Sequence, residues 1–149
     1  MFDLSTVEAD PKKLSGGSYF EIWREPDASI SGKPVSEPPA DKPWVLVVPF
    51  GIAYERALDE ARRPFSERLR TRSVTDEDLR KIQGQALGRT TFRGCGNLAV
   101  KGETVTWSEA KAVELMTEER WIRLREFVVW AAGNRAASAA QEEEQAKGN

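Results

Sequence analysis

The sequence of 149 residues contains no histidine and a single cysteine, Cys95. Without histidine, the chain cannot build a Ser–His or Cys–His catalytic pair, a His-ligated zinc site or an imidazole acid–base centre. One cysteine excludes an internal disulfide and a thiolate cage around a metal, and it is typical of a reducing compartment. We therefore expect a protein that is not an enzyme and that has no catalytic residue, metal or cofactor.

A long apolar run and a strong net charge are also missing. No apolar run approaches the roughly 18–20 residues that span a bilayer, and the N-terminal residues lack the basic-then-apolar order of a signal peptide. The formal net charge of −2 provides no general attraction to nucleic acid or to an anionic membrane. These absences predict a soluble intracellular protein that binds neither nucleic acid nor membrane.

The residues that are present predict a single α+β domain, mostly α, over residues 1–136. A bundle of about four helices, residues 50–136, would form its body, because the apolar positions there follow helical spacing. Residues 137–149 are alanine-rich and then acidic, which predicts a charged tail, either a solvated helical extension or a flexible, frayed end.

An N-terminal two-stranded hairpin, residues 19–48, would pack on this body. Residues 19–24 and 44–48 combine aromatic and β-branched side chains, as strands do. Five of the eight prolines fall between them, in residues 25–43. Because proline removes amide donors and fixes φ, this segment predicts an irregular loop.

The first helix of the body carries a continuous apolar face that is interrupted by Pro64. The face comprises Phe50, Tyr54, Ala57, Leu58, Ala61, Phe65 and Leu69. Proline removes a helical hydrogen bond and clashes with the preceding turn, so we expect a kink or a break at Pro64. A second helix begins at Thr75 with a capping-box pattern, and Leu79 lies on its inner side.

The segments after the start of the second helix contain several glycines and one N-cap residue. Gly84 and Gly88 either weaken the second helix, by about 1 kcal/mol each relative to alanine, or permit a close contact with another helix. Residues 92–105 contain three glycines and no helical period, which predicts a loop with a small hairpin. A short helix then begins with Ser108 as its N-cap.

The most apolar stretch, residues 117–137, predicts the last helix, with Thr117 as its N-cap. Its apolar residues cover more of the circumference than the usual stripe, so the helix must be covered on more than one side. Large aromatic residues are more often buried in a core than exposed to a partner, but this set exceeds what the predicted hairpin and helices need. We therefore predict a partner-binding face formed by Trp121, Leu124, Phe127, Val128 and Trp130.

Three other clusters have simpler structural interpretations. The acidic run 76–78 could serve as a general base or a metal ligand, but it lies at a helix N-terminus, where carboxylates act as caps. The arginines of residues 56–72 could contact phosphates, but interleaved acidic residues favour a solvated helix face. Cys95 lies between glycines with no neighbouring base to activate its thiol, so it is better interpreted as buried or incidental.

Several short motifs occur along the chain in a characteristic order. They are a strand leading into residues 54–58 and Arg63-Pro64, an acidic helix start at 75–78, the segment 105–108, a helix over 112–116, the helix with Leu124, Phe127 and Val128, and a Glu/Gln-rich end. From residue 19 onward, this order resembles the tail assembly chaperones of long-tailed bacteriophages. Two loops depart from the family pattern: residues 92–94 replace an acidic turn, and the proline-rich segment is long.

The resemblance implies a non-enzymatic protein of the host cytoplasm that is absent from the mature virion. Such chaperones bind the tape-measure protein, recruit tail-tube subunits and self-associate. A tape measure is a long helix with an apolar stripe, which a groove of aromatic residues would cover. The five predicted residues would then face this client or a neighbouring copy. Alternatives are a structural virion component, such as a head–tail connector or tail terminator subunit, and a host-directed inhibitor.

Overall fold

The computed structural model describes Asp3 and residues 16–147, and in the last helix it describes side chains as far as Asn134. Four strands form one antiparallel sheet: β1 (Ser18–Arg24), β2 (Ile30–Val35), β3 (Trp44–Val47) and β4 (Phe92–Gly96). Their order is β2-β1-β3-β4. A small hairpin of β5 (Ala99–Val100) and β6 (Glu103–Thr104) follows β4, as predicted. The α+β class is therefore confirmed.

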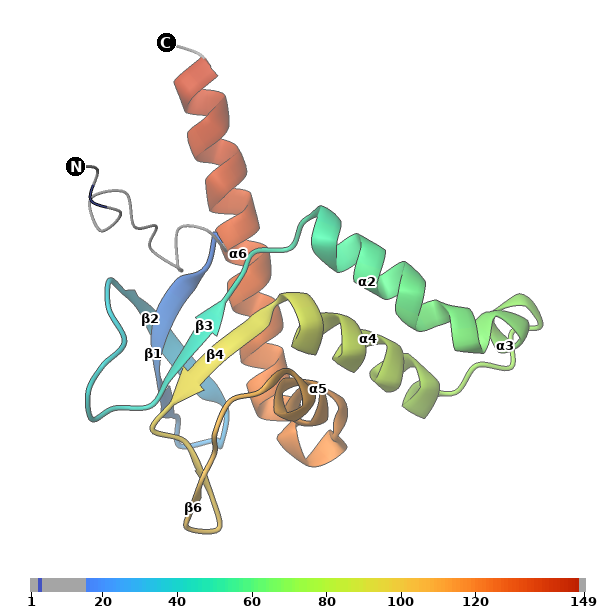
Figure 1. Ribbon diagram of the computed structural model, residues 1–149, viewed down its shortest axis with the longest axis horizontal. Coiled ribbons are helices and arrows are strands. Elements are labelled where there is room, and N and C mark those ends of the chain that lie inside the picture. The colour runs from blue at the N-terminus through green and yellow to red at the C-terminus, as the bar shows by residue number, and fades with distance from the viewer. Residues whose placement is uncertain (1–2, 4–15, 148–149) are drawn as a thin grey trace.

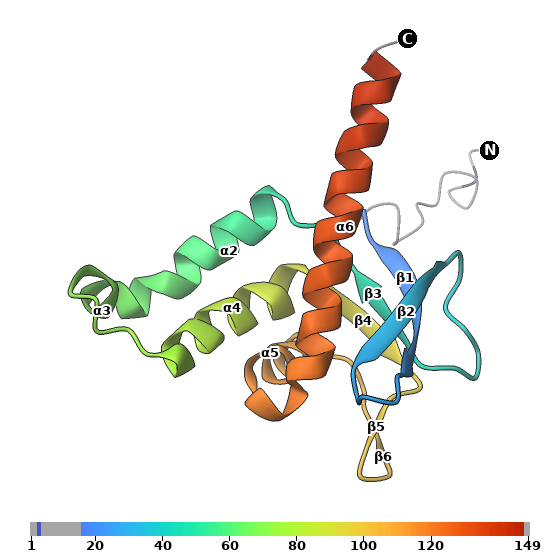
Figure 2. The same cartoon turned by 180° about the vertical axis from the view of Figure 1, so that it is seen from behind.

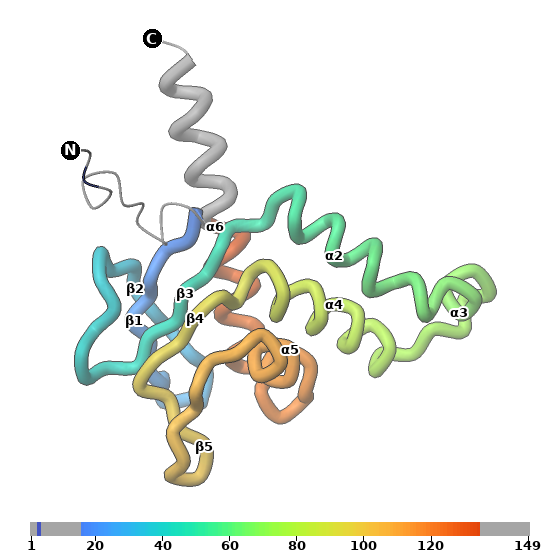
Figure 3. Tube along the Cα trace, in the orientation of Figure 1, coloured from blue at the N-terminus to red at the C-terminus, as the bar shows by residue number. Residues whose placement is uncertain are grey.

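The helices form an arm beside the sheet and a layer against it (Figure 1). Their bounds are α2 (Ile52–Arg62), η2 (Arg63–Phe65), α3 (Ser66–Arg70), α4 (Asp76–Thr90), α5 (Glu109–Thr117), η3 (Glu119–Trp121) and α6 (Ile122–Lys147). The arm, residues 52–90, runs out along α2, reverses at α3 and returns along α4 (Figure 3). Because α4 leads directly into β4, the arm is continuous with the sheet.

The prediction of a two-stranded hairpin is wrong in extent, because β2 lies inside the predicted proline-rich loop. The two predicted strands do pair as β1 and β3, while β2 occupies the free side of β1. The amide of Glu25 donates to the carbonyl of Ser29 at 2.9 Å. In an antiparallel hairpin, opposite residues are alternately hydrogen-bonded and not hydrogen-bonded, so this bond shows which residues of β2 are bonded to β1. Pro34 belongs to an unbonded pair, so its nitrogen faces the open edge, and the missing hydrogen removes no hydrogen bond between β1 and β2.

The segment before the small hairpin is also a strand, β4, and not the predicted loop. Its sequence, FRGCG, has no alternation of apolar and polar side chains. Gly96 is required by its neighbour on β3, since a Cβ there would collide with the indole of Trp44. A Cβ on Gly94 would lie 3.2 Å from the Cβ of Leu46. Strand formation here depends on a cross-strand partner, which local sequence does not show.

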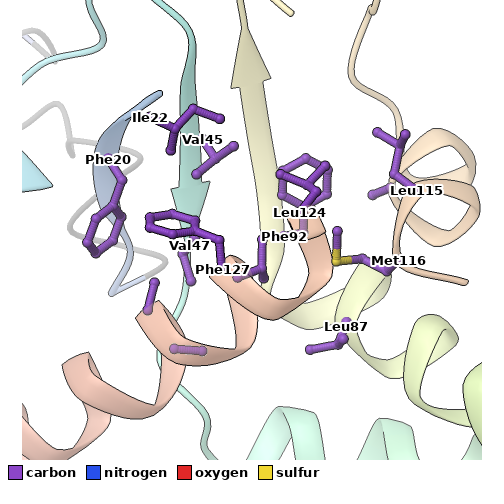
Figure 4. Packing of buried hydrophobic residues seen from close by; sticks show 14 of the residues in the cluster. Phe20, Ile22, Val45, Val47, Leu87, Phe92, Leu115, Met116, Leu124 and Phe127 are labelled. Carbon is purple, nitrogen blue, oxygen red and sulfur yellow. The ribbon is translucent and has the colours of Figure 1, made fainter. Parts of the chain in front are cut away.

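The core lies between one face of the sheet and α6 (Figure 2). Phe20 of β1 and Phe127 of α6 contact edge to face, with ring centroids 5.7 Å apart. Figure 4 shows Phe127 and Leu124 of α6 among side chains from the sheet. The remaining buried apolar residues of this cluster include Ile22, Val45, Val47, Leu87, Phe92, Leu115, Met116 and Val128.

The predicted break and cap of the arm are confirmed, whereas Leu79, predicted on the inner side of its helix, is 47% exposed. Helix α2 ends at Arg62, and a single 3₁₀ turn containing Pro64 precedes α3, so the apolar face breaks where proline predicts. Thr75 and Asp78 form a complete capping box at the start of α4. Gly84 and Gly88 permit a close helix contact, because a Cβ on Gly88 would lie 2.5 Å from the backbone nitrogen of Val113 in α5.

The predicted start of the last helix is wrong. Thr117 ends α5, whose N-cap is Ser108 as predicted, and Glu118 is extended with ψ 135. Helix α6 then begins at Ile122, so Trp121 lies in the turn before it. A threonine followed by acidic residues is compatible with both the start and the end of a helix. Here Thr117 lies at the end of α5, because α5 packs on α4 as far as this residue. The predicted tail, residues 137–149, falls outside the described side chains.

Candidate partner-binding surfaces

The candidate chemical groups of the sequence have structural roles here. Asp78 accepts hydrogen bonds from the Thr75 amide and from Arg68 Nη1 at 2.9 Å, and these contacts lower the pKa of its carboxyl. Burial raises the pKa of the Cys95 thiol to about 11, which disfavours the reactive thiolate. Within residues 16–147 and Asp3, no group of three His, Cys, Asp or Glu side chains could hold a metal.

Among the residues that the structure describes, no helix combines the length and the apolar character that crossing a bilayer requires.

The structure separates the five residues of the predicted partner-binding face. Leu124, Phe127 and Val128 are buried in the core of the single chain, so little of their surface is open to a partner in this conformation. Trp121 is half-buried against the same core. Trp130 is 53% exposed and remains available to a partner. The excess of apolar residues on this helix is thus largely explained by the sheet, which has two more strands than predicted and needs more cover.

Trp130 borders a groove between β2 and α6, which we name the strand–helix groove. It has a volume of about 300 Å³ and is lined by Ser29, Ile30, Ser31, Gly32, Arg123, Glu126, Phe127 and Trp130. Helix positions 123, 126, 127 and 130 are spaced along one face of α6, and the opposite wall is the backbone of the edge strand β2. The close approach requires Gly32, because a Cβ there would meet the Phe127 ring at 2.6 Å.

A second groove lies on the arm, and we name it the arm groove. Its volume is about 510 Å³, and its lining is Tyr54, Leu58, Arg62, Leu69, Asp76, Leu79, Arg80, Ile82 and Gln83. Leu79 is 47% exposed, and Leu58 and Leu69 are half-buried beside it. Burial and a hydrogen bond with Gln83 act in opposite directions on the Tyr54 phenol, and burial prevails, so its pKa is raised.

Both arginines in the lining of the arm groove are paired with carboxylates of their own chain. Arg62 pairs with Asp59 at 3.3 Å, and Arg80 pairs with Glu119 at 3.3 Å. The remaining charge in the lining is Asp76, at the start of α4. Because the two cations are already paired, the leucines of the groove favour an apolar ligand over an anionic one.

A third, larger groove of about 870 Å³ lies on the other side of α4, between η2 and α5. Its lining mixes Phe65 and Val113 with cationic and anionic side chains in equal number. This balance gives the groove no preference for a ligand of either charge.

Sequence reasoning assigned Leu58, Leu69 and Leu79 to the inner faces of their helices and therefore missed the arm groove. Their spacing is that of core residues. Only the arrangement of the arm, in which α2 packs on α4 alone among the long helices, leaves these leucines half-exposed. A signal was nevertheless present, because an arm of two helices cannot bury both sides of its apolar faces.

A protein-family model described as YdaY prophage protein matches residues 50–149. Searches of curated proteins and of solved structures found no match. The matched range includes the arm, β4, α5 and α6, and it excludes β1, β2 and β3.

Proposed function

The chain belongs to the family of YdaY prophage proteins, and from this phage or prophage origin and its apolar surfaces we propose that it is a tail assembly chaperone. In this role it would hold the tape-measure protein in the host cytoplasm, recruit tail-tube subunits and be absent from the mature virion. The role requires binding and release and no covalent chemistry, so the proposal is of a protein that is not an enzyme.

The observation that carries this proposal is the arm groove with its half-exposed leucines. An amphipathic helix binds such a groove by inserting apolar side chains at positions three and four residues apart. The tape-measure protein, as the resemblance to tail assembly chaperones implies, is a long helix with an apolar stripe. Covering that stripe would keep it soluble, because large exposed apolar patches promote aggregation.

This assignment moves the client surface from α6 to the arm. The apolar residues predicted for client contact on α6 are largely used by the sheet, whereas Leu58, Leu69 and Leu79 are not fully covered by their own chain. Helix α2 would then contribute to client binding through Tyr54 and Leu58.

Co-expression with the tape-measure protein of the same prophage tests the proposal. We expect the tape-measure protein to be insoluble alone and to co-elute with the chaperone in size-exclusion chromatography when both are present. The variant Leu79→Gln should reduce the affinity about tenfold, because the remaining exposed half of this side chain would no longer gain from burial.

Ile52→Gln is the matched control. Ile52 is 72% exposed on the same arm and does not line the groove, so the same change of chemistry should leave co-elution intact. Circular dichroism establishes that both variants are folded. If the wild-type chain elutes alone while the tape-measure protein stays insoluble, the chaperone proposal is wrong, and a stable ring retained in particles would identify a structural virion component instead.

A further inference from the structure

The outer edge of β2 carries backbone groups that are free to pair. Bonded pairs along the β1–β2 hairpin include Glu25 with Ser29, and they alternate with unbonded pairs. By this alternation, Ser31 and Lys33 direct their amides and carbonyls toward β1, whereas Ile30, Gly32 and Pro34 direct theirs outward. Within the described chain no strand lies on that side. Ile30 and Gly32 thus offer two donors and two acceptors, while Pro34 offers an acceptor only.

This unpaired edge is also one wall of the strand–helix groove. Edge strands are commonly protected from pairing by lysine and proline, and β2 has both, Lys33 and Pro34, in its C-terminal half. The N-terminal half, with Ile30 and Gly32, has no such protection. An added strand would lie there with one face toward Trp130, the exposed aromatic residue of the groove.

We propose that a second copy of this chain occupies this edge, by antiparallel pairing of the two β2 strands about a two-fold axis at Ser31. In this register Ile30 of each copy pairs with Gly32 of the other, which uses all four free donors and acceptors on each strand. Centring the axis on Gly32 would instead place the ring of Pro34 inside the ladder, where proline blocks pairing. With the axis at Ser31, Pro34 lies opposite Ala28, beyond the end of the strand.

Charge supports a second copy as the occupant. Within one chain Lys33 pairs with Glu21 at 3.8 Å and Arg123 pairs with Glu126 at 3.4 Å, so the edge and the groove carry little net charge that would repel an identical copy. A two-fold axis at Ser31 places Lys33 of one copy opposite Ser29 of the other, next to the turn that contains Asp27. The same axis relates the Arg123–Glu126 pairs of the two α6 helices. An isologous interface requires a surface that does not repel its own copy, and this edge meets that condition.

The size of the groove disfavours a helical client at this position. A volume of about 300 Å³ accommodates a few side chains, whereas a helix with its side chains is about 10–12 Å across. The inference concerns a different surface from the arm groove, so it does not depend on the proposed chaperone function.

Cysteine cross-linking tests the register directly. At the two-fold axis, Ser31 faces Ser31 in an unbonded pair, whose Cα atoms are about 4.5 Å apart in antiparallel sheets and within disulfide range. Under mild oxidation Ser31→Cys should therefore give a covalent dimer. Ser29→Cys is the matched control, because its own counterpart would lie four residues away along the strand, and it should give none. The wild-type chain, with Cys95 alone, provides the background.

Charge variants test the same contact without oxidation. Sedimentation of the wild-type chain over a range of concentrations should show a monomer–dimer equilibrium. Ser31→Lys and Ser31→Glu should each weaken the dimer about fivefold through like charges at the axis, and an equimolar mixture of the two should restore it. A wild-type chain that sediments only as a monomer, or equal cross-linking of the Ser29→Cys and Ser31→Cys variants, would overturn the proposal. Neither result bears on client binding by the arm.

Discussion

Individual residues in this protein act mainly by allowing two elements to pack closely or by donating a hydrogen bond to a buried acceptor. Gly32, Gly88 and Gly96 each leave room for a group from another element: the Phe127 ring, the backbone at Val113 and the Trp44 indole. Arg125 is buried, and its Nη1 donates to the carbonyl of Met116 at 3.1 Å near the end of α5. A cation at a helix C-terminus is favourable, although burial lowers the pKa of this guanidinium.

The glycines of the α4–α5 contact provide a test at this scale. Gly88→Ala should reduce the free energy of unfolding by about 2 kcal/mol, because the new methyl group collides with the backbone at Val113. Gly133→Ala in α6 is the comparison, since the nearest atom to a Cβ there, on Phe50, is 4.0 Å away. It should instead stabilise the protein by up to about 1 kcal/mol through helix propensity. Urea denaturation of both variants measures the difference, and equal effects would contradict a tight α4–α5 contact.

The helices of the arm are positioned by the residues at their ends as well as by their apolar faces. The break at Pro64 turns the arm back toward the sheet, and the capping box of Thr75 and Asp78 begins the return helix α4. Arg68 of α3 donates from Nη1 to both carboxylate oxygens of Asp78, each at 2.9 Å. The cap of α4 therefore also fixes the turn between α3 and α4, and through it the shape of the arm groove.

Acid should weaken this cap. The pKa of the Asp78 carboxyl is lowered in the folded chain, first by the Thr75 amide and then by Arg68. A lowered folded-state pKa means that the stabilisation is present above the unfolded pKa and is lost as the pH falls through the folded value. The wild-type chain should thus lose part of its stability below about pH 4. Asp78→Asn should be less stable at neutral pH and lose less on acidification, whereas Asp76→Asn, an exposed change in the same turn, should retain the wild-type pH dependence.

The whole molecule joins the arm to the sheet through α4. Helix α4 packs on α2 and on α5, and it continues through Thr91 into β4. Thr91 is buried, and its carbonyl accepts a hydrogen bond from the Val48 amide at 2.9 Å. These links predict that the arm and the sheet unfold together as one cooperative unit.

The distribution of tryptophan makes this testable. All five tryptophans lie outside the arm, so their fluorescence reports the sheet, α6 and nearby segments, whereas far-ultraviolet circular dichroism includes the arm helices. The two signals should give coincident denaturation curves, as a two-state transition requires. A helical transition at lower denaturant than the fluorescence transition would show that the arm unfolds separately.

Much of the helical body could be predicted from the sequence because its signals are local. Thr75, Ser108 and Pro64 act on their own turns, so the caps of α4 and α5 and the break after α2 lie where predicted. The start of α6 could not be predicted, because Thr117 suits either helix end. Among the five residues of the predicted partner-binding face, Trp130 alone is more than half exposed. Its neighbours Leu124, Phe127 and Val128 are buried by strands that have no local signature, so the sequence could not show their burial.

The sequence by itself determined the α+β class, the pairing partners β1 and β3, and the caps and breaks of the arm. These features follow from side-chain chemistry and backbone restrictions within a few residues. The tertiary structure alone decided that β2 and β4 complete the sheet, which apolar residues of α6 are buried, and which leucines of the arm are left half-exposed. Those outcomes depend on contacts between distant segments, such as Gly32 with Phe127 and Gly96 with Trp44, and no local pattern of residues specifies them.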